Sequence, residues 1–220
     1  MFEIERPPQK LLRKLYDIPT ASLADALDRT GIRGFMSHRI KPVLEGVKMV
    51  GPAITVWDTV AVGRGGVEMT LEAMDNACPG DIIVKGVSID ASDISIWGGL
   101  MATSAKARGL GGAVVDGGVR DLREIREMKF QIFSKSIVPS TSVGRLVTVK
   151  VNTPIVCGGV IVHPGDVIVG DDDGVVVIPK EKLEEIIEEA LRIDEIERKE
   201  AEELKKGKSI VETIRKYTRV

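Results

Sequence analysis

Cysteine and histidine are scarce in this sequence, which contains two of each. Cys78 and Cys157 lie far apart, and neither belongs to a Cys-x-x-Cys pair or to a Cys/His spacing typical of metal sites. This scarcity argues against both a disulfide framework and a zinc site. Two unpaired thiols fit a reducing compartment, so we expect a cytoplasmic protein.

Long hydrophobic runs are also missing. No apolar stretch approaches the roughly 20 residues that a membrane-spanning helix needs. The opening residues, MFEIERPPQKLL, are charged and have no signal-peptide hydrophobic region. Aromatic residues make up only 4% of the chain, while Lys, Glu, Ile and Val are frequent, a composition typical of thermophilic proteins.

An excess of charge of either sign is absent as well. The 31 Lys and Arg residues are interleaved with 33 Asp and Glu residues, which gives a net charge of -2. Nucleic-acid binding as the primary function is therefore not expected. With 43% hydrophobic and 29% charged residues over 220 positions, the chain is long enough for one large globular domain.

Hydrophobic periodicity predicts a mixed order of helices and strands, and hence a layered α/β or α+β single domain. Thr20 or Ser22 is expected to cap the second helix, and Gly31 to end it. The two similar segments PGDIIVKG and PGDVIVGD are each interpreted as a turn followed by a strand. Helices are predicted over 8–16, 20–28, 66–77, 98–108 and 121–129, and strands over 47–62, 82–87, 113–115, 131–134, 145–151, 155–162 and 167–178.

A long charged helix is predicted from Lys180 to about Lys206, followed by a short final helix in SIVETIRKY. Its apolar residues form a stripe only in the first half, and the second half is polar nearly all round. We therefore expect residues 18–178 to form the core, and the extension over 180–220 to contact a neighbouring subunit.

The stretch GGAVVDGGVRDLREI places opposite charges, Arg120 and Asp121, where a buried strand is expected to break at Gly117-Gly118. In one interpretation Asp116 accepts turn hydrogen bonds, Asp121 caps the next helix and Arg120 is a surface ion-pair partner. In a second, the planar fork of Arg120 binds a substrate carboxylate. In a third, Asp121 binds a hard divalent cation. The last two combine naturally, because a metal and an Arg that face one small anion can stabilise an enolate.

Two glycine-rich segments could bind anions. WGGLMATSAKARGLGG, residues 97–112, places bare glycines at the start of a small-residue helix, where unpaired backbone N–H groups can meet an anion. Helix entry and close packing explain the same pattern. GRGG, residues 63–66, could cradle a phosphate or form a rim of the site. DDDG, residues 171–174, is interpreted as a hairpin turn because it lacks the other ligands of a calcium loop.

Three blocks in order carry a resemblance to a known family: PGDIIVKG, then WGGLMATSAKARGLGGAVVDGGVRD, then PGDVIVGDDDGVVVIP. They resemble the family of regulator of ribonuclease E activity A (RraA) and 4-hydroxy-4-methyl-2-oxoglutarate aldolase. The resemblance covers roughly residues 20–207. It implies an α/β/β sandwich similar to the swivelling phosphohistidine-domain class, with a long C-terminal helix, assembled as a homotrimer or a homohexamer made of two trimers.

The resemblance also implies a chemistry. Aldolase members are lyases dependent on Mg²⁺ or Mn²⁺ that release pyruvate by aldol cleavage, and they decarboxylate oxaloacetate. By this likeness Arg120 would contact the pyruvyl group and steady the enolate, and Asp121 would hold the metal. Backbone amides of Gly98, Gly99, Leu100 and Met101 would bind the pyruvate carboxylate. A glutamate of the neighbouring subunit's C-terminal helix, Glu195 or Glu197, would complete the metal shell through water.

The chain departs from the aldolase pattern at one position. That pattern has an aspartate, twenty intervening residues and then Arg-Asp, and here the position of the first aspartate holds Gly99. Glycine can neither orient a water molecule nor relay a proton. Asp93, in DASDISIW, is a candidate substitute. The sequence thus predicts a metal-dependent lyase acting on a small 2-oxo acid, and leaves as the alternative a non-catalytic RraA-like regulatory ring.

Overall fold

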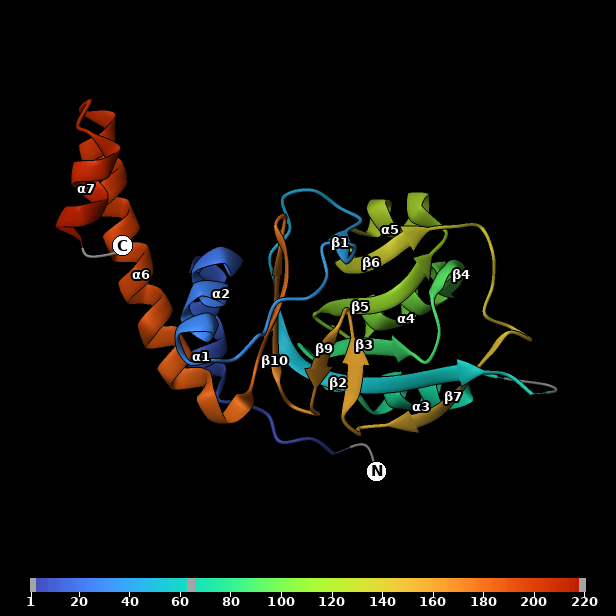
Figure 1. Cartoon of the computed structure of the whole chain (residues 1–220). Coiled ribbons are helices and arrows are strands. Elements are labelled where there is room, and N and C mark those ends of the chain that lie inside the picture. Colours follow the sequence, from blue (N-terminus) through green and yellow to red (C-terminus); the bar gives the residue numbers. More distant parts are fainter. Residues whose placement is uncertain (1–2, 63–65, 218–220) are drawn as a thin grey trace.

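The computed structural model describes residues 3–62 and 66–217 and shows one large mixed sheet, helices packed on it and a helical arm (Figure 1). Short 3₁₀ turns at Leu15–Asp17 and Lys180–Lys182 precede α2 and α6. The helices are α1 (Gln9–Lys14), α2 (Thr20–Arg29), α3 (Glu68–Asn76), α4 (Gly99–Ala107), α5 (Leu122–Met128), α6 (Leu183–Lys205) and α7 (Ile210–Lys216).

All the predicted strands are present, and two of the predicted segments are hairpins, but the strands over 41–42 and 91–97 were not predicted. Residues 155–162 form β8 and β9 around Gly158-Gly159, and residues 167–178 form β10 and β11 around Asp172-Asp173. The strands are β1 (Lys41–Pro42), β2 (Met49–Val60), β3 (Ile82–Val87), β4 (Ala91–Trp97), β5 (Gly112–Val119), β6 (Ile132–Ile137), β7 (Leu146–Val151), β8 (Ile155–Cys157), β9 (Val160–Val162), β10 (Val167–Asp171) and β11 (Gly174–Ile178).

The centre of the sheet is parallel and its margins are antiparallel. The main path runs β1-β6-β5-β3-β2-β10-β11, while β4 pairs with β5 and β7 pairs with β2. Strands β2, β3, β4, β5 and β6 are joined by parallel pairings. Parallel strands need crossover connections, which α3, α4 and α5 supply. The carboxyl ends of β4, β5 and β6 therefore meet at one edge.

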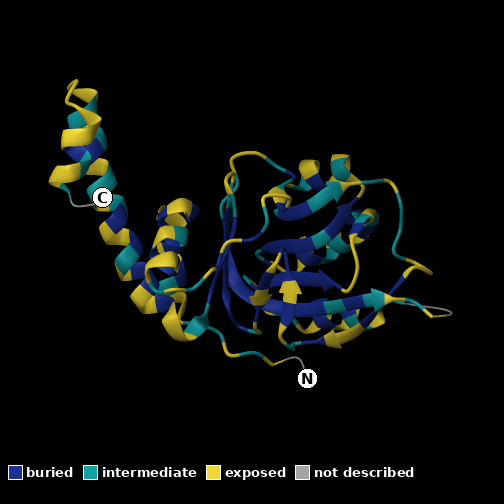
Figure 2. Ribbon diagram, in the orientation of Figure 1, coloured by how far each residue is buried: buried dark blue, intermediate teal, exposed yellow. Residues whose placement is uncertain are grey.

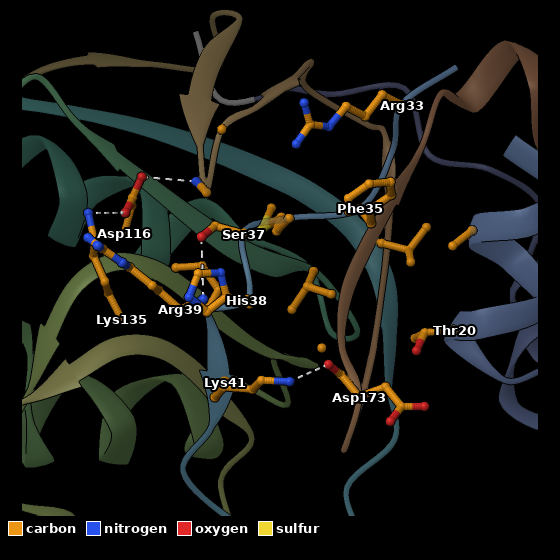
Figure 3. A pocket seen from close by; sticks show the side chains of 18 of the residues that line it. Thr20, Arg33, Phe35, Ser37, His38, Arg39, Lys41, Asp116, Lys135 and Asp173 are labelled. Carbon is orange, nitrogen blue, oxygen red and sulfur yellow. Dashed lines mark hydrogen bonds and ion pairs between the residues drawn. The ribbon is translucent and has the colours of Figure 1, made fainter. Parts of the chain in front are cut away.

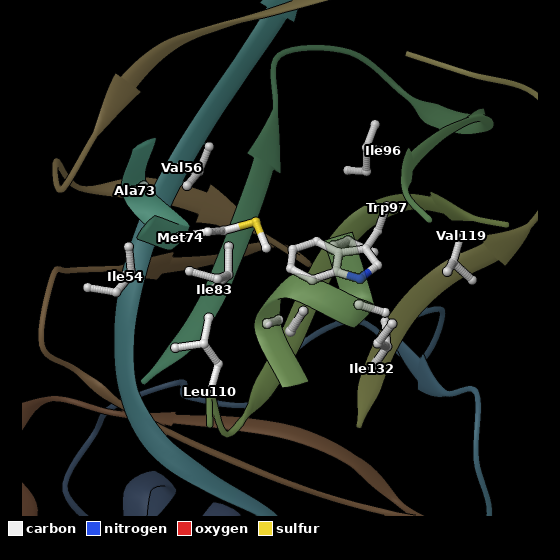
Figure 4. Close-up of a cluster of buried hydrophobic side chains, with 14 of the residues drawn as sticks. Ile54, Val56, Ala73, Met74, Ile83, Ile96, Trp97, Leu110, Val119 and Ile132 are labelled. Carbon is white, nitrogen blue, oxygen red and sulfur yellow. The ribbon is translucent and has the colours of Figure 1, made fainter. Parts of the chain in front are cut away.

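The strands of this sheet are largely buried (Figure 2), and clusters of hydrophobic side chains lie on both of its faces. Under α3, α4 and α5, aliphatic side chains surround Trp97 (Figure 4). The Trp97 ring also stacks on that of Phe130, with centroids 6.2 Å apart. The opposite face is covered by the β8–β9 hairpin and by residues near Met36 and Ile40. Helices on one face and β-structure on the other make the α/β/β sandwich that the resemblance implied.

The two Pro-Gly-Asp turns have the same construction. In each, the glycine has φ near +88°, at Gly80 (+88°) and Gly165 (+87°), a conformation that favours glycine. In each, the aspartate accepts the amide three residues back, Asp81 from Cys78 at 2.7 Å and Asp166 from His163 at 2.8 Å. The shared motif is thus a matched turn geometry at the start of β3 and of β10.

Helix α2 starts and ends where predicted, but a different residue caps its start. Gly31, with φ +77°, follows its last turn, and the amide of Ile32 returns to the Leu27 carbonyl at 3.0 Å. Neither Thr20 nor Ser22 caps the helix with its own side chain. Instead the Asp171 carboxylate, from β10, accepts the Thr20 amide at 2.8 Å and its hydroxyl at 2.5 Å. The cap comes from a residue 151 positions away, which local sequence could not reveal.

Strand β5 is longer than predicted. It continues through Gly117 and Gly118 to Val119, and the ladders with β4 and β6 shift register there instead of ending. The expectation of a break at the glycines was therefore wrong. A Cβ on Gly117 would lie 2.9 Å from the Ile96 side chain, and one on Gly118 would lie 2.4 Å from that of Val138, so the glycines permit close packing within the strand.

The helical arm has the predicted polarity. The first half of α6 buries Leu183, Ile186, Ile187, Ala190 and Ile193 against α2 and its neighbours, whereas Leu191 is exposed. The second half projects from the sheet together with α7 (Figures 1 and 2). Within the described part of the chain, no helix is both long and apolar enough to cross a membrane.

Candidate functional site

The site predicted from sequence lies where the parallel strands β4 and β5 end. Trp97 of β4 pairs with Val119 of β5, so the residues that follow each strand emerge side by side. The amide of Arg120 donates to the Trp97 carbonyl at 3.1 Å and extends this pairing by one step. Clefts beyond the carboxyl ends of parallel strands are the usual ligand sites of such sheets. Gly98 to Met101 and the Arg120-Asp121 pair are thereby brought together.

Asp121 has an unusual backbone and an unexpected partner. It adopts the left-handed conformation, φ 59° and ψ 38°, at the residue before α5. Its side chain makes no capping bond to α5. Instead its Oδ2 accepts the amide of Gly99, at the start of α4, at 2.9 Å. The interpretation of Asp121 as the cap of its own helix is therefore wrong, and the carboxylate instead links the starts of two helices.

The Arg120 side chain makes two contacts but remains partly exposed. Its Nε lies 3.5 Å from Asp121 Oδ2, and its Nη1 donates to the Ser140 carbonyl at 3.3 Å. The side chains of Arg120 and Asp121 are 43% and 40% exposed, so both can meet a ligand. Ser140 follows β6 and also bonds to β4, donating to the Asp93 carbonyl and accepting the Ser95 amide. This positioning residue was not predicted, because its role depends on the β6 end reaching β4.

A pocket of about 320 Å³ opens beside this pair. Its polar end holds Arg120, Asp121 and the start of α4, and Ser142 contributes from the segment after β6. A volume of this size suits a small organic acid rather than a large cofactor. The remaining lining is mostly apolar and comes from α3, β4, α4 and the loop after β6: Val67, Leu71, Met74, Ile96, Trp97, Leu100, Met101 and Val143.

The predicted backbone donors differ in availability. Gly98 precedes α4, and Gly99, Leu100 and Met101 form its first turn, whose amides have no acceptor within the helix. The amide of Gly99 is already bonded to Asp121. Leu100 and Met101 are therefore the donors best placed for an incoming anion. The lack of a side chain at Gly98 leaves room for the Arg120 and Asp121 side chains, because a Cβ there would lie 2.8 Å from Asp121 Oδ2 and 3.2 Å from Arg120 Nε.

The missing acid at position 99 has a spatial substitute. A Cβ built on Gly99 would collide with Oε2 of Glu124, from α5, and would lie 3.2 Å from the Asp121 Cβ. The Glu124 carboxylate thus fills the space into which a side chain at position 99 would project. Asp93, the candidate substitute from the sequence, is exposed on β4 and is not among the residues nearest the Gly99 Cβ position, whereas Glu124 is. Glu124 could have been considered from the sequence, because it lies three residues after Asp121, in the first turn of the same helix.

The donors present suit a hard, hydrated cation only. Within residues 3–62 and 66–217, no three His, Cys, Asp or Glu side chains converge into a metal cluster. Asp121 supplies one carboxylate, and Mg²⁺ commonly binds through one or two carboxylates while keeping several waters. The fit is thus to Mg²⁺ or Mn²⁺ rather than to a metal that needs a full protein cage. Glu195 and Glu197 lie on α6, at the far end of the same chain from α4 and α5 (Figure 1).

Two further sequence predictions have simple outcomes. DDDG forms the β10–β11 turn, as expected, and Asp171 within it is the cap of α2. Of GRGG, residues 63–65 lie outside the described residues, so the phosphate or rim role expected for this segment stays a prediction.

Comparison with known proteins places the chain in a family. The family model "RraA-like: Aldolase/RraA" matches residues 20–177. A protein of Halalkalibacterium halodurans, provisionally named a 4-hydroxy-4-methyl-2-oxoglutarate aldolase, is 41% identical over 177 residues, 79% of this chain and 78% of its own. An uncharacterised protein of Methanocaldococcus jannaschii is 40% identical over 179 residues, 78% of this chain and 80% of its own.

Comparison with solved structures supports the same family. RraAS2 of Streptomyces coelicolor, described as an unusual member of the RNase ES inhibitor RraA family, superposes with a TM-score of 0.80 at 30% identity, over 89% of this chain and 98% of its own. An uncharacterised Pseudomonas syringae protein gives a TM-score of 0.84 at 28% identity, over 95% and 98%. The chain belongs to the RraA-like family, which includes proteins named as aldolases and others described as ribonuclease inhibitors.

Proposed function

We propose that this protein is a divalent-metal-dependent lyase that cleaves a carbon–carbon bond in a small 2-oxo acid and releases pyruvate. The observation that carries the proposal is the convergence of Arg120, Asp121 and the open amides of α4 in one small pocket at the ends of β4 and β5. Aldol cleavage and oxaloacetate decarboxylation both fit, because each passes through a pyruvate enolate that these groups can stabilise.

Substrate binding follows from the position of the charges. The amides of Leu100 and Met101 donate hydrogen bonds to the carboxylate next to the keto group, at the positive end of the α4 dipole. The Arg120 guanidinium faces the keto oxygen. When the C3–C4 bond breaks, its electron pair moves into the keto group and negative charge develops on that oxygen. Arg120 stabilises this charge more in the transition state than in the bound substrate, which is the condition for catalysis.

Asp121 is the proposed protein ligand for Mg²⁺ or Mn²⁺. One of its oxygens is bonded to the Gly99 amide, which fixes the orientation of the carboxylate. A cation held there would supply positive charge that stabilises the negative charge of the enolate. In a homotrimer or homohexamer, Glu195 or Glu197 of a neighbouring subunit would complete the metal shell through water.

Glu124 is the proposed proton-handling group. Its carboxylate occupies the space of the side chain that Gly99 lacks. After C–C cleavage the enolate of pyruvate takes up one proton at C3. In aldol cleavage a base must also remove the proton of the C4 hydroxyl. A carboxyl group beside the pocket can both donate the proton to C3 and remove the proton of the hydroxyl. Such proton transfer commonly contributes about 10²–10⁴-fold to a rate.

The test is turnover by purified protein. Pyruvate release from oxaloacetate and from 4-hydroxy-4-methyl-2-oxoglutarate is followed with Mg²⁺ or Mn²⁺, after subtraction of the protein-free rate. Asp121→Asn and Arg120→Gln should each lower the rate about 10²–10³-fold. Arg123→Gln, on the exposed side of α5, is the control and should change little. The proposal fails if metal does not stimulate turnover, or if Asp121→Asn is as active as the parent protein.

The second candidate is a non-catalytic regulatory ring. The likeness to RraAS2 favours it, as does the absence of a side chain at Gly99. Calorimetry with Mn²⁺ separates the two candidates. Stoichiometric binding that Asp121→Asn abolishes supports the lyase, whereas a folded protein that binds no Mn²⁺ and releases no pyruvate supports the regulatory ring.

A further inference from the structure

A second and larger cavity lies on the face of β5 opposite the lyase pocket. It measures about 730 Å³ and shares no lining residue with the pocket around Arg120. Its walls are the loop of residues 33–41, strand β11, the turn at Gly158-Gly159 and the side chains of Asp116 and Lys135 (Figure 3). The proposed lyase function uses none of these groups.

Cations dominate the polar lining. Arg33, Arg39, Lys41 and Lys135 face two carboxylates, Asp116 and Asp173. This local surplus of positive charge stands in a chain whose net charge is -2. Figure 3 shows Arg33 and Lys41 at opposite ends of the cavity, with Arg39 and Lys135 on a third side. Such a distribution favours an anion whose charge or length engages several cations at once.

Within the part of the chain that the structure describes, the carboxylates pair with Lys135 but not with the other three cations. Asp116 is shared between Lys135 Nζ, at 3.2 Å, and the amide of Gly158, at 2.9 Å. Lys41 Nζ donates to the backbone carbonyl of Asp173 at 2.6 Å and keeps its charge unpaired. Among the described residues, neither Arg33 nor Arg39 forms an ion pair with a carboxylate. Two guanidinium groups thus remain available for a ligand.

Lys135 is a lining residue whose charge is already balanced by carboxylates. Its side chain is 16% exposed, and its Nζ lies 3.2 Å from both Asp116 Oδ1 and Asp90 Oδ1. Burial disfavours the charged form of Lys135, but the two carboxylates outweigh it, so its pKa lies above the usual value. The group therefore stays protonated at neutral pH.

The cation-bearing loop is held rigidly. The amide of Met36 donates to the Val175 carbonyl at 2.9 Å, and the amide of Val177 donates to the Gly34 carbonyl at 2.7 Å. Beyond them, the Ser37 amide reaches the Gly158 carbonyl at 2.7 Å. A tight turn follows, closed by a bond between the Ile40 amide and the Ser37 carbonyl at 2.9 Å, and it presents Arg39 at the cavity. A preformed loop loses little conformational entropy on binding.

An aromatic ring lies beside the charges. Phe35 is 40% exposed, and the Arg33 guanidinium carbon is 5.2 Å from its ring centroid. The neighbouring wall is formed by Val175 and Val176 of β11. The cavity thus combines an apolar side with cationic sides, a combination suited to an organic body that carries a strongly charged group.

We propose that this cavity is a binding site for a small phosphorylated organic molecule, whose phosphate meets Arg39 and Lys41 and whose body lies against Phe35. Guanidinium groups bind phosphate oxygens through paired N–H donors, and a phosphate monoester carries more charge than one carboxylate. The cavity volume is in the range of sites for molecules of nucleotide size.

The test is calorimetry on the full-length protein with AMP, ribose 5-phosphate, inorganic phosphate, adenosine and citrate at physiological ionic strength. AMP should bind most tightly and adenosine at least about tenfold more weakly, because the phosphate supplies charge-assisted bonds. Arg39→Gln should weaken AMP binding about tenfold or more. Arg13→Gln, an exposed arginine on α1 outside the cavity, is the matched control. Arg120→Gln should bind AMP as the parent protein does.

Four results overturn the proposal: no phosphate probe binds below about 1 mM; adenosine or citrate binds as tightly as AMP; Arg39→Gln binds as well as Arg13→Gln; or binding is lost with Arg120→Gln, which would assign the phosphate to the lyase pocket. Arg39 is exposed, so its replacement leaves the core intact. Failure of lyase turnover with AMP binding intact would leave this site standing.

Discussion

The carboxylate of Glu124 fills the space into which a side chain on Gly99 would project. The two residues belong to different helices, α5 and α4, whose starts are joined by the bond from the Gly99 amide to Asp121 at 2.9 Å. The space that an acidic side chain at position 99 would take is therefore filled by a residue 25 positions further along the chain.

Exchange of the acid between the two positions is the first prediction. Glu124→Gln should lower the rate of pyruvate release by about 10²–10⁴-fold, because the group proposed to transfer the proton is lost. Glu124→Ala should lower the rate in the same way and also empties this space, so adding Gly99→Asp to Glu124→Ala should restore part of the rate. Glu127→Gln, on the exposed side of α5, is the control. No loss in Glu124→Gln would remove Glu124 from the reaction.

A methyl group at Gly98 should disturb the site without unfolding the protein. Its backbone is extended, φ -149°, so alanine is sterically permitted there. The added Cβ would lie 2.8 Å from Asp121 Oδ2 and would displace the Arg120-Asp121 pair. We expect kcat/KM in Gly98→Ala to fall by about 10²-fold, because small misplacements of reacting groups are costly. Its Tm should stay within a few degrees of the parent value; a large drop in Tm with kcat/KM unchanged would contradict the prediction.

Sharing of the site between subunits predicts complementation. Asp121→Asn alone and the double variant Glu195→Gln/Glu197→Gln alone should each be weakly active. Subunits of the two variants, unfolded and refolded together, should form mixed oligomers in which some sites have both an intact Asp121 and an intact glutamate pair. Recovery of turnover in the mixture is expected, with the assembly state followed by analytical ultracentrifugation. A monomer, or no recovery in a confirmed mixed oligomer, would limit the site to one chain.

Lys85 of β3 and Asp58 of β2 form a buried ion pair, and replacing only one of the two residues should destabilise the protein. Lys85 Nζ lies 2.9 Å from Asp58 Oδ2 with both side chains fully buried, and Thr148 donates to Asp58 at 2.8 Å. Lys85→Met should lower the free energy of unfolding by about 3–5 kcal/mol, because it leaves an uncompensated buried charge. Asp58→Leu/Lys85→Met should be more stable than Lys85→Met. Urea unfolding measures both, with the exposed Lys150→Met as control.

The cap of α2 should make stability depend on pH in acid. Burial alone would raise the pKa of Asp171, but the Thr20 hydroxyl and amide and the Lys48 charge outweigh it and lower that pKa. The stabilisation is therefore present above the unfolded-state pKa of about 3.9 and is lost as the pH falls through the lower folded-state value. Asp171→Asn should cost about 1 kcal/mol at pH 7.

The same variant should flatten the decline in stability below pH 4, as measured by thermal unfolding between pH 2 and 7. Asp93→Asn, at an exposed carboxylate of β4, is the control and should follow the parent curve. A curve for Asp171→Asn that is parallel to the parent curve in acid would show that another carboxylate is responsible for the decline.

Local chemistry in the sequence determined much of the fold. Apolar runs, Pro-Gly-Asp turns and the stop at Gly31 depend on residues within a few positions, and the structure confirms them. The Arg120-Asp121 pair could be singled out for the same reason, because opposite charges at the end of a buried strand are conspicuous in the sequence alone.

The tertiary structure decided what depends on distant contacts. Asp171 capping α2, Asp121 bonding to α4 instead of α5, and Glu124 standing in for the side chain at Gly99 all join segments whose proximity arises from strand order. Strand β5 runs through its glycines because β4 and β6 pair with it on both sides, which local propensity cannot register. The sequence alone determined which groups the site has, and the parallel pairing of β4 with β5 decided which of them meet.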